Sequence, residues 1–221
     1  MNGKLIVIEG LDGSGKATQT ALLCKHLEKE GRSFKKLSFP NYDSPSSALV
    51  KLYLGGELSK TPDGVNPYAA AAFYAVDRCA DYLKYWREDY ESGALFVSDR
   101  YATSNAVYQT SKLPESEWET YLRWLEEFEY SKLGVPKPDK VIYLDMDVDV
   151  SQKLLSKRYG GDESKKDIHE QNAGFLRNCR KTALYAARTL GWHVIRCDDG
   201  ESPIPLEDIS KEIIRIAETV L

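Results

Sequence analysis

The stretch that most constrains this chain runs from residue 4 to residue 18. A continuous apolar segment, KLIVIE (4–9), leads directly into GLDGSGKAT (10–18). Unbroken aliphatic residues indicate a strand that is covered on both faces of a sheet. Glycines at this position allow tight turns and let phosphate oxygens approach the backbone, and a phosphate-binding loop requires the order strand, glycine-rich loop, helix. The sequence therefore predicts a phosphate site at the end of a buried strand.

Within this loop the spacing is G-x-x-x-x-G-K, ending at Lys16. Backbone N–H groups of residues 13–16 would point at the phosphates from the positive end of the helix dipole. Lys16 would reach between the β- and γ-phosphates as a point charge. We expect this loop to bind ATP through Gly10, Gly13, Ser14, Gly15, Lys16, Ala17 and Thr18.

Ala17 departs from the usual pattern, which places a metal-binding hydroxyl after the lysine. Mg²⁺ keeps several waters in nucleotide sites, so a water can take the place of the missing oxygen. The next hydroxyl, on Thr18, is expected to point toward the α-phosphate and is not a simple replacement. We therefore expect Asp99 to hold the Mg²⁺ ion through water.

Elsewhere, short apolar runs alternate with helical patterns along the chain. Strands are expected at 33–39, 94–99, 140–145 and 192–197. One helix is expected to follow the glycine loop and end at residue 31, and another to end near residue 190. Further helices are expected at 44–56, 67–91, 115–133, 150–158 and 206–221. Such alternation predicts parallel strands joined by crossover helices, in a three-layer α/β/α sandwich with a central parallel sheet. The 221 residues suit one domain, 1–221, and the polar segment within about 157–170 suits a small mobile lid.

Composition and charge exclude some classes of binding partner. A net charge of -4 argues against binding a nucleic acid polymer, although a local basic pocket for phosphates is compatible with it. The apolar stretches have the length of strands, so no membrane span is expected. Four scattered cysteines form no C-x-x-C pair, which favours free thiols in a reducing cytoplasm over a disulfide scaffold or a zinc site.

Further motifs follow the loop in a fixed order: FYAVDR (73–78), DRYATSNAVYQ (99–109), YLD (143–145) and the basic stretch 158–170. Together with EGLDGSGK (9–16) they resemble the thymidylate kinases, which are nucleoside monophosphate kinases of the P-loop NTPase type. The resemblance covers nearly the whole chain, and the DRY-containing run is its most specific part. It implies ATP-dependent phosphorylation of dTMP to dTDP, Mg²⁺ as cofactor, and a homodimer.

The resemblance also implies roles at the base end of the site. Phe73 would stack on the pyrimidine, an interaction of about 1–3 kcal/mol per base. Arg78 would donate to O4 of the base, and Asn105, which carries both a donor and an acceptor, would read N3. Tyr108 would pack on the deoxyribose, with Gln109 as its neighbour. The alternatives are core packing for Phe73 and a solvated helix face or a salt bridge for Arg78.

At the phosphate end, Asp99 follows a strand, where open α/β sheets bind ligands. The resemblance gives Asp99 a place near the metal and Arg100 a contact with the acceptor phosphate. It places Asp12 near the sugar hydroxyl and the metal, and gives Arg158 of the lid a catalytic, ATP-binding role. The alternative for the Asp99–Arg100 pair is a turn that closes the strand.

Two further positions depart from the family pattern. Ser38 stands where the family commonly has a phosphate-binding arginine, so Arg100 is expected to carry more of that contact. Gly13 stands where some members have a catalytic arginine, so positive charge is expected from the lid. The basic lid residues are Lys157, Arg158, Lys165 and Lys166.

Two other functions remain open at this point. A deoxynucleoside kinase would need a carboxylate base, for which Glu9 or Asp99 could serve. A nucleotide-binding sensor without catalysis is supported only by Ala17 and Ser38, whereas the intact DRY run and the basic lid argue against it.

Overall fold

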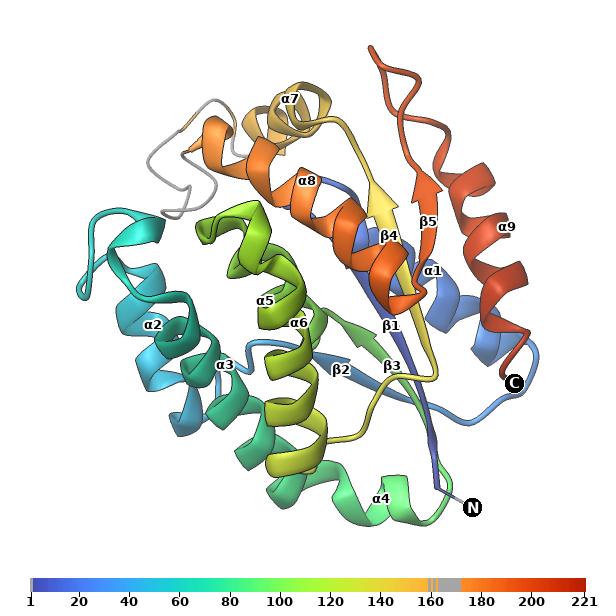
Figure 1. Cartoon of the computed structure of the whole chain (residues 1–221). Helices are drawn as coiled ribbons and strands as arrows, with labels where there is room; N and C mark the ends of the chain where they lie inside the picture. The colour runs from blue at the N-terminus through green and yellow to red at the C-terminus, as the bar shows by residue number, and fades with distance from the viewer. Residues whose placement is uncertain (1, 159, 161, 163–171) are drawn as a thin grey trace.

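The computed structural model describes residues 2–158, 160, 162 and 172–221, without the side chains of Pro62 and Arg158 (Figure 1). Its centre is a five-stranded sheet in the order β2-β3-β1-β4-β5, and every strand pairs in parallel with its neighbours. The strands are β1 (Lys4–Gly10), β2 (Lys35–Ser38), β3 (Leu95–Asp99), β4 (Lys140–Asp145) and β5 (His193–Arg196). The parallel sheet with crossover helices is confirmed.

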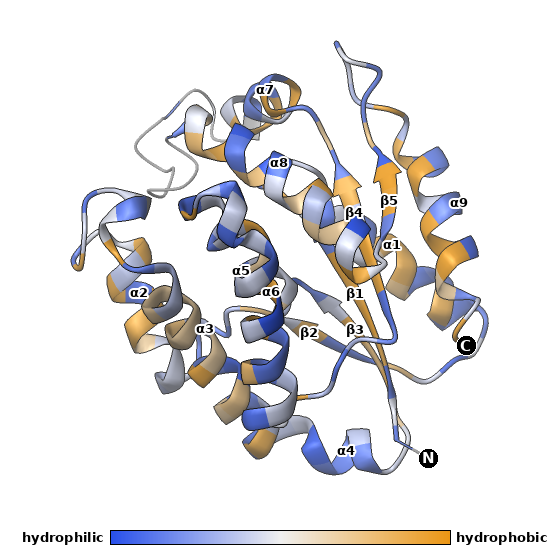
Figure 2. Cartoon of the chain, viewed as in Figure 1, coloured by the Kyte–Doolittle hydropathy of each residue, from blue (hydrophilic) through white to orange (hydrophobic). Residues whose placement is uncertain are grey.

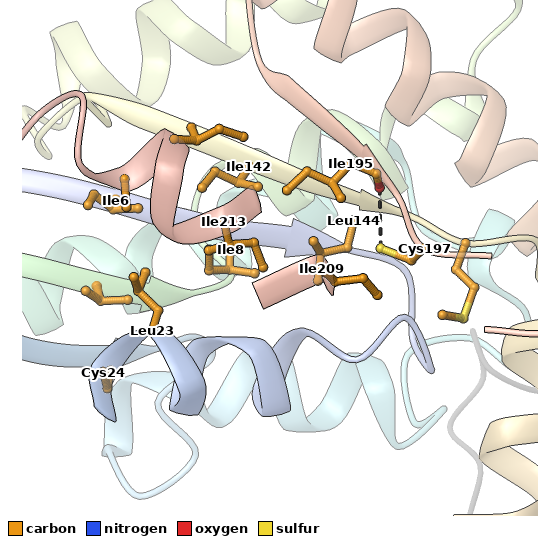
Figure 3. Packing of buried hydrophobic residues seen from close by; sticks show 14 of the residues in the cluster. Ile6, Ile8, Leu23, Cys24, Ile142, Leu144, Ile195, Cys197, Ile209 and Ile213 are labelled. Carbon is orange, nitrogen blue, oxygen red and sulfur yellow. Dashed lines mark hydrogen bonds between the residues drawn. The ribbon is translucent and has the colours of Figure 1, made fainter. Parts of the chain in front are cut away.

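The middle strand, β1, is buried on both faces because helices cover the sheet on each side. Ile6 and Ile8 face one side, where they pack with Leu23 of α1 (Lys16–Lys29) and Ile213 of α9 (Leu206–Ala217), as Figure 3 shows. Alternate residues of a strand point to opposite faces, so the intervening Leu5 and Val7 join a second core with aromatic rings. Figure 2 shows the same arrangement in hydropathy, with apolar strands inside and polar residues along the outer side of α9.

On the second face lies a thicker layer of helices. It contains α2 (Ala48–Leu54), α3 (Pro67–Asp81), α4 (Arg87–Glu91), α5 (Thr103–Tyr108), α6 (Trp118–Glu126) and α8 (Ala173–Leu190). Helix α7 (Val148–Arg158) packs with both sides, since Val150 and Leu154 join the core with α1 and α9 while Val148 joins the cluster with α8. Short 3₁₀ turns occur at Pro45–Ser47, Pro62–Gly64, Thr110–Lys112 and Glu115–Glu117. None of the helices in the described ranges is long and apolar enough to cross a bilayer.

The structure refines the expected elements in several places. The segments expected as helices over 67–91 and 115–133 each contain a π-helical turn, at Tyr82–Trp86 and Glu127–Lys132. Helix α5 was not expected, because its six residues are too few to show a helical repeat. Strands β2 and β5 are shorter than expected, and α9 ends at Ala217. Most of the expected lid lies outside the described residues.

Candidate active site

Glycines at the end of β1 set the shape of the phosphate loop. Gly13 and Gly15 have φ angles of 81° and 88°, in the left-handed region that favours glycine. A Cβ atom on Gly13 would also lie 2.7 Å from the carbonyl oxygen of Ser151 in α7. Gly15 is the N-cap residue of α1, so the loop leads directly into the N-terminus of this helix. The predicted order of strand, loop and helix is present.

An open pocket of about 580 Å³ lies over this loop. Of the predicted ATP-binding residues it is lined by Gly13, Gly15, Lys16, Ala17 and Thr18, together with Asp12, Asp99 and Arg100 and three leucines, Leu154, Leu155 and Leu206. Gly10 and Ser14 do not line the pocket. Instead, a Cβ on Gly10 would lie 2.5 Å from Ser14 Oγ, so these two residues allow close packing beneath the loop.

Lys16 is buried and turned back onto its own loop. Its Nζ donates to the Leu11 carbonyl at 2.7 Å and lies 3.6 Å from Asp12 Oδ1. Burial lowers the pKa of Lys16, and the neighbouring charge of Arg100 adds to that effect against the opposing carboxylates. A desolvated ammonium held by one carbonyl and one carboxylate can exchange these partners for phosphate oxygens.

Arg100 lies at the centre of the site, with a φ angle of 64° that is rare for a residue other than glycine. Its guanidinium contacts Asp12, lies 3.6 Å from Glu9 Oε1 and stacks over the Tyr108 ring at 5.4 Å. Burial opposes its charge, but Asp12, Tyr108 and Glu9 outweigh burial and raise its pKa well above the ordinary value. Arg100 therefore forms ion pairs with Asp12 and Glu9. The alternative from the sequence was a turn in which Arg100 pairs with Asp99, and these pairs differ from it.

Tyr108 completes this cluster. Its hydroxyl donates to Asp12 Oδ2 at 2.9 Å. Asp12 therefore joins three of the predicted site residues, Lys16, Arg100 and Tyr108, although they lie on α1, the loop after β3 and α5. Burial raises the pKa of Tyr108, so its hydroxyl remains a donor over the physiological pH range.

Glu9, which the sequence suggested only as a possible base for a deoxynucleoside kinase, also belongs to this cluster. It is fully buried, and its Oε1 accepts the Gly10 N–H at 2.9 Å. Its Oε2 accepts from Thr103 Oγ1 at 2.7 Å and Ser104 Oγ at 2.8 Å. These bonds tie the start of the phosphate loop to the first turn of α5. The sequence signal for these bonds was the pair of hydroxyl residues inside the DRYATS motif.

At the other end of the site, Arg78 on α3 is buried and paired with Glu129. Nε and Nη2 donate to the two carboxylate oxygens at 3.0 and 2.9 Å, and the guanidinium lies over the rings of Phe39 and Tyr101. Asn105 on α5 donates to the same carboxylate at 3.1 Å. The salt-bridge alternative for Arg78 is therefore present, with a partner that the sequence did not indicate.

Phe73 is half-buried on α3 and belongs to none of the buried core clusters among the described residues. It lies five positions before Arg78, so the two side chains leave the helix about 140° apart. Tyr74, four positions before Arg78, lies about 40° from it and packs edge-on against Tyr53. Sequence reasoning missed Tyr74 as a second aromatic side chain close to Arg78 on the helix surface.

The remaining predicted residues are placed as follows. Gln109 is 1% exposed, and its Oε1 has no hydrogen-bond partner within the described part of the chain. Asp99 is half-buried in the loop pocket and lies beside Ser38, which is exposed at the end of β2. Lys157 is exposed near the end of α7, whereas the side chain of Arg158 and residues 165 and 166 lie outside the described residues.

Comparisons with known proteins agree on one family. The family model described as thymidylate kinase matches residues 8–213. A thymidylate kinase of Mycobacterium tuberculosis is 31% identical over 193 residues, covering 85% of this chain and 87% of the relative. A probable thymidylate kinase of Thermococcus gammatolerans is 30% identical over 218 residues, covering 98% and 96%. The structure of Candida albicans thymidylate kinase, at 22% identity, superimposes with a TM-score of 0.70 over 99% of this chain and 92% of that one.

Proposed function

The chain belongs to the thymidylate kinase family and phosphorylates dTMP to dTDP with ATP, and we propose a division of labour among its residues for that reaction. The supporting observation is that Asp12 joins Lys16, Arg100 and Tyr108 in one cluster beside the glycine loop. In this proposal Gly10, Gly13, Ser14, Gly15, Lys16, Ala17 and Thr18 form the ATP site. Asp12, Asp99 and Arg100 act where the phosphoryl group is transferred.

Phosphoryl transfer depends on positioning and on charge more than on covalent chemistry. The acceptor is a phosphate oxygen that is already ionised, so no strong general base is needed. Lys16 and Arg100 offset the charge that develops, after exchanging Asp12 for phosphate oxygens. Glu9 is a poor candidate for a base, because the Gly10 N–H and two hydroxyls already occupy its carboxylate. This observation disfavours the deoxynucleoside kinase alternative.

A magnesium ion fits the donor set of this pocket. Carboxylates are the ligands that Mg²⁺ prefers, and Asp12 and Asp99 both line the pocket with Lys16. Ala17 is exposed there and offers no side-chain oxygen. We propose that Asp99 holds the ion through water, with Asp12 nearby. Bound Mg²⁺ would neutralise charge on the phosphates.

At the base end, we propose that Arg78 and Asn105 bind the edge of thymine and that Phe73 lies against its ring. Tyr108 packs on the deoxyribose, since its ring already stacks on Arg100 and its hydroxyl reaches Asp12. We propose that Gln109 supports this side of the site, where its Oε1, which has no partner among the described residues, can make a polar contact. We retain Arg158 as the lid residue that contacts ATP, within a single domain 1–221 whose lid spans about 157–170.

We further propose a homodimer in a reducing cytoplasm. Val76 on α3 and Leu83 in the following π-helical turn are about half exposed, and residues seven apart share one face of a helix. A second copy of the chain would cover this apolar face. Sedimentation of the wild type and of Leu83→Glu tests the proposal, because the charged variant should sediment as a monomer. The four cysteines are free thiols, which supports a reducing compartment.

The activity is tested with purified protein, ATP, Mg²⁺ and a panel of acceptors. We expect dTMP to be phosphorylated fastest, followed by dUMP. Turnover of nucleosides alone would instead indicate a deoxynucleoside kinase. ATP binding without phosphorylation of any acceptor would indicate a sensor.

Ala17→Ser tests the metal proposal separately. Restoring a hydroxyl should lower the Mg²⁺ concentration needed for half-maximal turnover, because one more oxygen becomes available to the ion. Thr18→Ser, which keeps a hydroxyl at the next position, is the matched control. An unchanged Mg²⁺ dependence in Ala17→Ser would show that residue 17 lies away from the ion.

A further inference from the structure

Glu129 occupies an unusual position for a carboxylate. It lies in the π-helical turn Glu127–Lys132 after α6 and is 0% exposed. Its Oε1 accepts from Arg78 Nη2 and Asn105 Nδ2, and its Oε2 accepts from Arg78 Nε. Figure 1 shows that these residues come from three elements, α3, α5 and the end of α6, which lie side by side on one face of the sheet. One buried carboxylate thus holds both residues proposed to bind the base.

The charges of Glu129 and Arg78 cancel in the interior. Burying either ion alone is costly, whereas a pair with two hydrogen bonds is tolerated. The side chain of Arg78 is 3% exposed and that of Glu129 is 0% exposed. Thymine is an uncharged base, so a neutral pair that still offers N–H donors suits it better than an unpaired guanidinium.

Glu129 also fixes which way the Asn105 amide faces. Asn105 Nδ2 donates to Glu129 Oε1 and to the Ala71 carbonyl at 3.2 Å, and neither of these atoms can donate. The amide nitrogen must therefore face them, and Oδ1 is left as an acceptor on the other side. Arg78 uses Nε and Nη2 for Glu129, so Nη1 is left as a donor.

This leaves an acceptor on Asn105 and N–H donors on Arg78 for the base. Thymine presents N3–H, a donor, beside O4, an acceptor, whereas cytosine presents an acceptor at N3 beside a donor amino group. We propose that Glu129 is a positioning residue that sets the preference for thymine over cytosine by holding Asn105 and Arg78 in this arrangement. The inference rests on the proposed binding of the base at these two residues. Uracil has the same N3–H and O4, so Glu129 does not distinguish it from thymine.

Glu129→Gln is the direct test. The variant keeps the shape but replaces one acceptor with an amide nitrogen, which can donate to Asn105 Oδ1 and turn Nδ2 toward the base. We expect the ratio of kcat/KM for dTMP over dCMP to fall by about tenfold or more, since a site that hydrogen-bonds its substrate discriminates strongly. The ratio for dTMP over dUMP should stay within about twofold, and the KM for ATP should not change.

Two more variants complete the design. Glu129→Asp keeps the charge that neutralises Arg78, so it folds even if Glu129→Gln does not, but its shorter side chain cannot hold both partners. We expect it too to lower the dTMP over dCMP ratio. Glu127→Gln, at an exposed position in the same π-helical turn, is the matched control and should match the wild type.

The possible results distinguish a failure of the positioning role of Glu129 from a failure of the proposed kinase activity. An equal loss with dTMP, dUMP and dCMP, or an unchanged dTMP over dCMP ratio in both Glu129 variants, would overturn the positioning role. Asn105→Ala tests the base site itself, and an unchanged ratio in that variant would overturn the proposed base contacts. A wild type that phosphorylates no nucleoside monophosphate would instead contradict the proposed activity.

Discussion

The two ends of the site hold their arginines in different ways. At the phosphate end, the side chain of Arg100 is 18% exposed and contacts Asp12, which is 22% exposed beside an open pocket. At the base end, Arg78 and Glu129 are enclosed, with 3% and 0% exposure. A charged phosphate can displace a carboxylate that is partly exposed to solvent, whereas a neutral base supplies no charge to replace a buried carboxylate. The phosphate end is therefore suited to exchange of partners, and the base end to a fixed arrangement.

The largest effect is expected at Lys16. Lys16→Ala removes the cation that we propose to lie beside the transferred phosphate, so we expect kcat to fall roughly 10³-fold or more. Binding of dTMP, measured by calorimetry, should change little, because the base end is intact. Lys25→Ala, at an exposed position of the same helix, is the matched control. Near-normal turnover in Lys16→Ala would contradict the assignment of the loop.

The next largest effect is expected on the stability of the protein when the buried ion pair at the proposed base end is broken. Arg78→Met leaves Glu129 buried without its guanidinium, so we expect the free energy of unfolding to fall by about 3 kcal/mol or more. The double variant Arg78→Met/Glu129→Leu replaces both ions by apolar side chains and should regain most of that loss. Urea denaturation measures both. A loss in the single variant as small as that for an exposed ion pair would contradict the contrast between the two ends.

Arg100→Met tests the same contrast at the phosphate end. Its pair with Asp12 is more exposed than the pair of Arg78 with Glu129, so we expect the free energy of unfolding to fall less than in Arg78→Met, by about 1–2 kcal/mol. Activity should respond more strongly, with kcat/KM for dTMP falling about 100-fold as a charge-offsetting donor is lost. Urea denaturation and steady-state kinetics on one preparation give both numbers. A large loss of stability together with normal activity would assign Arg100 a structural role.

The smallest effect concerns Lys112, which follows α5 in the short 3₁₀ turn Thr110–Lys112. Burial lowers its pKa to about 8 from the ordinary 10.5, and its Nζ donates to Tyr53 and the Val65 carbonyl. Between these pH values the unfolded chain binds more protons than the folded one, so this group's contribution to stability rises with pH. Between pH 7.5 and 10, the urea concentration at the midpoint of unfolding should therefore rise for the wild type relative to Lys112→Met. A constant difference between the two proteins would contradict the lowered pKa.

Much of the fold was predicted from local patterns. Continuous apolar strands such as KLIVIE identified the parallel sheet, and the glycine spacing identified the loop with its pocket residues Lys16, Ala17 and Thr18. Helix α5 was missed because six residues are too few to show a repeat. The DRYATSNAVYQ run indicated the family, and Asn105 and Tyr108 both come from it. Their roles in binding stay predictions.

The sequence by itself determined the parts whose signals are local: the order of strands and helices, the glycine loop, and the family to which the chain belongs. Only the tertiary structure decided how the charged residues pair. Glu129 is 51 positions from Arg78, and Glu9 is 94 from Thr103. Within the charged run LEEFEYSK, Glu129 looks like any residue of a solvated helix face. Its burial depends on packing between elements far apart in the chain, and no local pattern records that packing.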